Sequence, residues 1–86
     1  MPEISRFYGI VIKMYFGDHE PPHFHALYAG QEARIEIRTL AVVAGQLPGR
    51  ALGLVAEWAS LHQTELLELW QKAKDLQPLH KIDPLP

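Results

Sequence analysis

The spacing of the apolar residues changes once along this chain, and that change limits the fold more than any other feature. Up to about residue 45 the apolar residues recur at every second position, as in strands that bury one face. From residue 50 to residue 74 they recur at every third or fourth position, as in a helix with one apolar stripe. Strands followed by a helix predict an α+β fold, in which a small antiparallel sheet packs on one long C-terminal helix.

Three to four hairpin-connected strands explain the first part of this pattern. We expect strands at residues 4–16, 23–28 and 31–38, with a weaker strand at residues 40–44. The chain has 86 residues, which suits one domain with one core. The predicted division of the domain 1–86 is a sheet part at 1–45, a helix at 49–75 and an extended, proline-rich tail at 77–86.

Composition excludes several classes of protein. The chain has no cysteine, which excludes disulfides, thiolate metal ligands and a cysteine nucleophile. Its net charge of −2 argues against a broad nucleic-acid-binding surface, so RNA or DNA is a weak expectation. No apolar run approaches the roughly 20 residues that span a bilayer, and the first residues are not typical of a signal peptide. We therefore expect a cytoplasmic protein that makes no use of a membrane.

The candidate site is the histidine-rich segment Asp18-His19-Glu20-Pro21-Pro22-His23-Phe24-His25. A two-residue turn at Ala29-Gly30 would pair His23 with Glu36 and His25 with Arg34 on one face of a hairpin. The same register would pair apolar residues on the other face, which we expect to lie toward the helix. Two histidines at positions i and i+2 of a strand project to the same side, close enough to hold one metal ion.

Two chemistries fit this segment. As a metal site it would use His23 and His25 with one of Asp18, His19 or Glu36, and would take zinc, nickel or manganese. As a catalytic site it would use His23 and His25 as acid and base, with Asp18 or Glu36 orienting an imidazole. A third interpretation has equal weight, namely two exposed strand histidines with structural hydrogen bonds.

Residues outside this segment point less specifically to a function. His62 lies within the apolar stripe of the predicted helix, which favours a core histidine over a member of the site. Phe7, Val11 and Tyr15 share the mixed face of the first predicted strand. If no helix covers that face, these three residues form an exposed apolar patch, which is typical of a partner or ligand surface.

Motifs spread over nearly the whole chain carry a family resemblance. They are Pro2-Glu3-Ile4-Ser5-Arg6-Phe7, Gly9-Ile10, Met14-Tyr15-Phe16, the histidine-rich segment, Leu47-Pro48, Glu57-Trp58-Ala59, Leu61-His62 and Glu65-Leu66. With these motifs the chain resembles the bacterial family called domain of unknown function 4160. The recurring positions of that family fall on Asp18, His19, Pro21, Pro22, His23, His25, Trp58 and His62.

The resemblance implies no established activity. Members of the family are often encoded beside another short protein, which implies a two-gene system of the toxin–antitoxin kind, and some are labelled transcriptional regulators. Our first hypothesis is thus an interaction module with a protein partner or a second copy of itself, carrying a histidine-based ligand or metal site. The alternatives are a small nuclease-like hydrolase and a transcriptional regulator. The regulator has the weakest support, because the predicted fold has no second helix for a helix-turn-helix.

Overall fold

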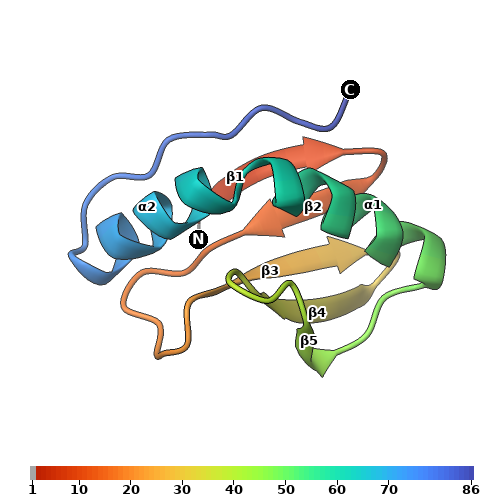
Figure 1. Cartoon of the computed structure of the whole chain (residues 1–86), viewed down its shortest axis with the longest axis horizontal. Helices are drawn as coiled ribbons and strands as arrows, with labels where there is room; N and C mark the ends of the chain where they lie inside the picture. Colours follow the sequence, from red (N-terminus) through yellow and green to blue (C-terminus); the bar gives the residue numbers. More distant parts are fainter. Residues whose placement is uncertain (1) are drawn as a thin grey trace.

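Five strands and two helices make up the computed structural model, which describes residues 2–86 (Figure 1). The strands are β1 (Glu3–Phe7), β2 (Ile10–Lys13), β3 (His23–Tyr28), β4 (Gln31–Glu36) and β5 (Val42–Gly45), and the helices are α1 (Gly49–Leu61) and α2 (Gln63–Lys74). The strands form one antiparallel sheet in chain order, so each strand pairs with the next one. The α+β class is confirmed, but the sheet has five strands where the sequence predicts three to four.

The extra strand arises because the run 4–16, predicted as one strand, folds back on itself. Tyr8 and Gly9 have φ angles of 50° and 80°, and Phe7 pairs with Ile10 across this two-residue turn. Glycine adopts such angles without steric cost, which favours a turn between twisted strands. The alternation of apolar and polar residues continues through the turn, so the sequence pattern does not reveal the turn.

The hairpin of β3 and β4 has the predicted register. Ala29 and Gly30 form its turn, with φ angles of 50° and 80°. His23 pairs with Glu36 and His25 with Arg34, while the residues between them, Phe24, Ala26, Ala33 and Ile35, are buried on the helix side. The two histidines thus project from the other face of the sheet, the free face, which the helices leave uncovered apart from the contact of Trp70 with His23.

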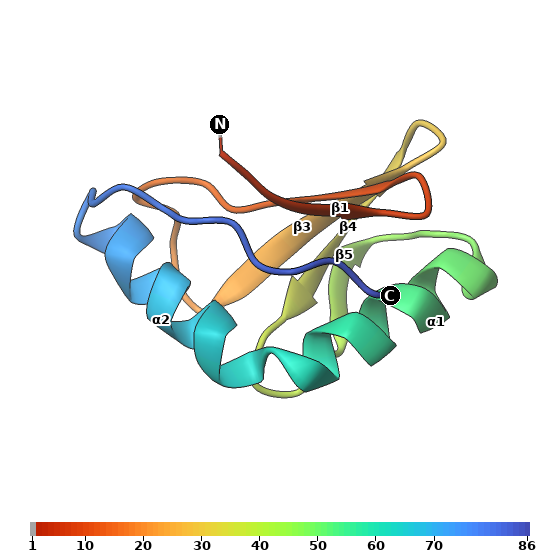
Figure 2. The ribbon, with the colours of Figure 1, turned by 90° about the horizontal axis from the view of Figure 1, so that it is seen from above.

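The predicted long helix is wrong in one respect, since it consists of two helices that meet at His62. This residue leaves the helical conformation, with φ −129° and ψ 21°, and it caps both helices. Figure 2 shows the two helices at an angle to each other on one side of the sheet. The bend lets both helices follow the twisted sheet, and the side-chain amide of Gln63 donates to the carbonyl oxygen of Ile37 (2.9 Å) at the bend.

The core lies between the sheet and the two helices, with Trp58 at its centre. The Trp58 ring packs against Phe7 and Phe24, at centroid distances of 5.3 and 5.9 Å. Phe7 is therefore a core residue, and the predicted exposed patch of Phe7, Val11 and Tyr15 does not form. Phe7 pairs directly with the buried Ile10 across the Tyr8-Gly9 turn, so both side chains point to the core side of the sheet.

The tail 77–86 forms no helix or strand, and it runs beside β1 and the helices (Figures 1 and 2). Its Ile82 and Leu85 are buried in the core. The Ile82 N–H donates to the carbonyl oxygen of Ile4 (2.7 Å), and Trp58 Nε1–H donates to that of Asp83 (2.8 Å). The tail is therefore part of the folded domain. No helix within residues 2–86 is long and apolar enough to cross a membrane.

Candidate metal centre

The segment between β2 and β3 carries Asp18 over the free face of the sheet. It is fastened to the end of α2 by a hydrogen bond from the Gly17 N–H to the Ala73 carbonyl oxygen (3.1 Å). An ion pair of 2.7 Å joins Lys74 to Glu20 in the same segment. Gly17, with φ 66°, makes the turn that brings Asp18 back toward β3.

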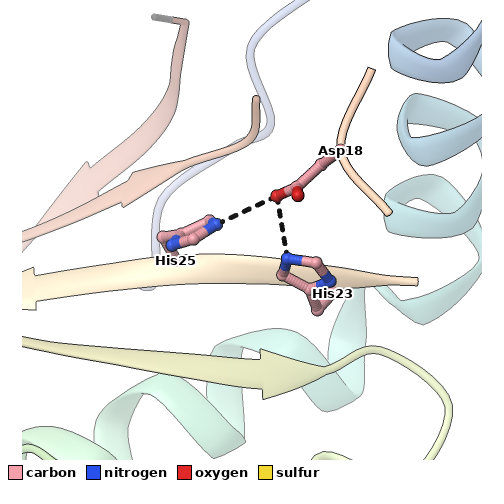
Figure 3. A group of neighbouring side chains, drawn as sticks. All are labelled: Asp18, His23 and His25. Atoms are coloured by element: carbon pink, nitrogen blue, oxygen red, sulfur yellow. Dashed lines mark hydrogen bonds and ion pairs between the residues drawn. The ribbon is translucent and has the colours of Figure 1, made fainter. Parts of the chain in front are cut away.

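Asp18 meets both histidines of β3 through one oxygen atom. Its Oδ2 lies 2.9 Å from Nε2 of His23 and 3.4 Å from Nε2 of His25. Figure 3 shows the two imidazoles on the same side of β3, with the Asp18 side chain approaching from the preceding loop. One potential ligand atom from each of the three residues lies within 4.8 Å of the other two. We call Asp18, His23 and His25 the His-Asp cluster.

The far nitrogen of each ring also has an acceptor. His23 Nδ1–H donates to the Pro21 carbonyl oxygen (2.7 Å), and His25 Nδ1–H donates to Oε2 of Glu32 (2.8 Å). We assign the ring proton to Nδ1 because neither acceptor has a hydrogen to give. Both Nε2 atoms are then the ones that face Asp18. Metal-ligating histidines usually have this arrangement, with the other ring N–H held by a carbonyl or a carboxylate.

The cluster is largely shielded from solvent. The side chains of His23, His25 and Asp18 are 3%, 10% and 17% exposed. The Tyr15 ring stands edge-on to His25 at a centroid distance of 4.3 Å, and Trp70 of α2 contacts His23 at 5.1 Å. These aromatic rings restrict the rotamers of both imidazoles, which preorganises the cluster.

Two carboxylates, those of Asp18 and Glu32, contact the imidazoles of the cluster. Burial alone would raise the pKa of the Asp18 carboxyl, but the His19 backbone N–H and the imidazoles of His25 and His23, in their protonated form, together hold that pKa below its usual value. Burial raises the pKa of Tyr15, and the negative charges of Glu32 and Asp18 raise it further, so its phenol keeps its proton at neutral pH. The cluster therefore offers a carboxylate and two imidazoles, with a second carboxylate behind one of them.

The structure brings together three of the five predicted site residues. The other two stay outside the cluster. The His19 ring is 78% exposed, and its Nδ1 lies 3.1 Å from the other carboxylate oxygen of Asp18, Oδ1. The side chain of Glu36 makes no hydrogen bond or ion pair within residues 2–86, although Glu36 is opposite His23 in the sheet. The prediction that Glu36 orients His23 is thus wrong, because the Pro21 carbonyl takes that place.

Glu32 is the site residue that sequence reasoning missed. It lies two positions before Arg34 in β4, and thus diagonally opposite His25 in the predicted register. Diagonal neighbours on one face are within reach of long side chains, so the register contained this signal. His62 lies at the joint of the helices, beside Trp58 and Glu65, and takes no part in the cluster.

Comparison with known proteins gives one match. A family model described as Domain of unknown function (DUF4160) matches residues 9–71, a segment that contains the whole cluster. No curated protein and no solved structure matches the chain.

Proposed function

Because the chain belongs to the DUF4160 family, whose description assigns no activity, we propose from its geometry that it binds a divalent transition-metal ion. The ligands are Oδ2 of Asp18 and Nε2 of His23 and His25. One observation carries the proposal: both Nε2 atoms face the same carboxylate oxygen while both Nδ1 atoms already donate to acceptors.

The hydrogen-bond inventory of the cluster supports a cation at its centre. With its proton on Nδ1, a neutral imidazole presents a lone pair at Nε2. Two such lone pairs beside a carboxylate oxygen form a set of acceptors without a donor. A metal dication between them satisfies all three atoms, and the carboxylates of Asp18 and Glu32 balance its charge.

The ligand types narrow the choice of metal. Two imidazole nitrogens and one carboxylate oxygen suit zinc, nickel, manganese or ferrous iron better than calcium or magnesium, which prefer all-oxygen sites. Three protein ligands leave at least one coordination position for water or another small ligand. The site is therefore of the open kind.

Metal binding would also organise the fold. Asp18 belongs to the loop between β2 and β3, whereas His23 and His25 belong to β3. An ion held by all three ties the loop to the sheet, so part of the binding free energy becomes folding free energy. We infer a small metal-binding module whose loop closes over the ion.

Hydrolysis by a metal-bound water is the second candidate function, and the open coordination position favours it. Acid–base catalysis by His23 without a metal has less support. The nitrogens of that ring lie 2.7 Å from the Pro21 carbonyl oxygen and 2.9 Å from Oδ2 of Asp18, and its side chain is 3% exposed, so a substrate cannot reach either nitrogen. The protein partner, the two-gene system and the regulator stay predictions.

Isothermal titration with zinc, nickel and manganese chlorides tests the proposal. We expect one site per chain with a Kd tighter than about 100 μM for at least one of the metals. Asp18→Asn and His25→Gln should each weaken that binding by about tenfold or more. His80→Gln is the matched control, since His80 is half-exposed and bound to Glu65, outside the cluster. Binding that is absent, or equal in all four proteins, refutes the proposal.

A further inference from the structure

Two cationic side chains flank His25 on the free face of the sheet. Lys13 of β2 pairs with His25 from one side, and Arg34 of β4 pairs with it from the other. Directly opposite residues of neighbouring strands point to the same face. We propose that Lys13 and Arg34 hold a phosphate group on the open coordination position of the metal; this inference rests on the proposed metal site.

The spacing between opposite residues of neighbouring strands places both cationic side chains within reach of the ion. Opposite residues have Cβ atoms about 4.5–5.5 Å apart, and both side chains are longer than that separation. Nε2 of His25 points toward Asp18 and His23, so the ion lies beside the row that Lys13, His25 and Arg34 form. The ammonium and guanidinium groups can therefore approach a ligand of the ion from opposite sides.

Neither cation is neutralised by an acidic partner. Within residues 2–86, Lys13 and Arg34 form no ion pair, whereas Arg6 pairs with Glu3 at 2.7 Å and Lys74 pairs with Glu20 at 2.7 Å. Glu3 is the cross-strand neighbour of Lys13, but Arg6 occupies its carboxylate with two hydrogen bonds. The two cations next to the cluster are thus free to bind an anion.

The charge that remains on this face favours an anion. A dication balances Asp18 and Glu32, as described above. The other charged residues beside the two histidines in the sheet are then Lys13, Arg34 and Glu36. The Glu36 carboxylate makes no ion pair within the described residues. The face as a whole is left positive. A phosphate group suits it, because its oxygens can meet a metal ion, a guanidinium fork and an ammonium group together.

The shape of the site limits the size of the anion. The helices pack on the other side of the sheet (Figure 2), but Trp70 of α2 contacts His23, so a ligand has to approach from the His25 side of the cluster. At the cluster itself the side chains of His25 and Asp18 are only 10% and 17% exposed. Side chains with so little exposed surface can meet only a small group at the end of a ligand. The ligand we infer is a phosphate group presented end-on.

Phosphate binding to the metal-loaded protein tests this inference. The protein is loaded with one equivalent of the metal that binds most tightly and is freed of excess ion by gel filtration, and inorganic phosphate is then titrated. The variant Lys13→Met/Arg34→Met keeps the aliphatic stems and loses both charges. We expect it to bind phosphate at least about tenfold more weakly than the wild type, with metal affinity changed less than about twofold.

A matched variant and a metal-free sample separate the outcomes. Arg50→Met removes an exposed cation at the start of α1 and should leave phosphate affinity unchanged. The inference is overturned if metal-loaded protein binds no phosphate, if the double variant binds it as well as the wild type, or if metal-free protein binds it equally. A wild type that takes up no metal fails the earlier titration first, so the two failures are distinguishable.

Discussion

The Glu32 carboxylate accepts a hydrogen bond of 2.8 Å from Nδ1 of His25, across the hairpin of β3 and β4. The bond reaches diagonally, because the direct cross-strand neighbour of His25 is Arg34. It turns Nε2 of the imidazole toward Asp18 and increases the basicity of that nitrogen. In the proposed metal site Glu32 would act on the ion through His25, without touching the ion.

Glu32→Gln should therefore weaken metal binding although it removes no ligand. We expect a loss of about 10-fold to 100-fold in affinity, the usual cost of losing such an outer partner. Glu36→Gln is the control, since it removes an equal charge from the same strand but no contact to the cluster. Titration calorimetry measures both variants. Equal losses would mean that charge alone, and not the hydrogen bond, supports the site.

Metal should raise the thermal stability of the protein. A ligand at 100 times its Kd adds about 2.7 kcal/mol to the free energy of unfolding. For a domain of this size that corresponds to an increase in Tm of about 10–20 °C. Differential scanning fluorimetry with and without the metal measures the shift, and a chelator should reverse it. The same increase in Asp18→Asn would place the ion somewhere other than the His-Asp cluster.

Acid should act on the metal-free protein through Asp18. Its pKa is lowered in the folded state, so its carboxylate stabilises the fold above the ordinary aspartate pKa of about 3.9. That contribution is lost as the pH falls from there through the lowered folded-state pKa. Asp18→Asn should thus unfold less steeply with acid below about pH 4. Far-UV circular dichroism of both proteins in chelator is the measurement, and parallel curves would contradict the expectation.

Two glycines should respond to alanine in opposite directions. Gly45 has φ +73°, and a Cβ there would overlap the backbone carbonyl oxygen of Glu32, so Gly45→Ala should cost about 2 kcal/mol or more. Gly53 lies within α1 with open space around it, so Gly53→Ala should stabilise by about 0.5–1 kcal/mol. Urea denaturation measures both. A stabilised Gly45→Ala would show that β5 packs differently against β4.

The indole of Trp58 should hold the tail in place. Trp58→Phe removes the donor to the Asp83 carbonyl oxygen and leaves a smaller ring in the core. We expect faster amide exchange at residues 77–86, followed by mass spectrometry. Leu76→Ala, at an exposed position just before the tail, is the control and should leave exchange unchanged. A tail that stays protected in Trp58→Phe would show that the bond from Trp58 is not needed to hold it.

The sequence contained enough to predict the β3–β4 register, and with it the face that His23 and His25 share. Each face of that hairpin is chemically uniform only in the register found, and a turn of two residues permits it. The helix joint was not predictable in the same way. His62 lies in an unbroken apolar stripe, and no proline or glycine near it marks the end of a helix. The bend follows from the packing of the helices on a twisted sheet, which the local sequence does not show.

The site was predictable to the extent that it lies on regular structure. Periodicity placed His23 and His25, which are on a strand, but could only propose Asp18, His19 and Glu36 as alternatives. Asp18 is on a loop, and the contacts of that loop with α2 fix its position. Such contacts join parts of the chain more than 50 positions apart, which no local pattern contains.

The order of strands in the sheet has a consequence for how the chain folds. Every strand pairs with its neighbour in sequence, so the whole sheet can assemble from short-range contacts, which are the ones that form fastest. The bond from Ile82 to Ile4 spans nearly the whole chain. Closing so long a loop costs more entropy, so we expect the tail to dock late, on a sheet that has already formed.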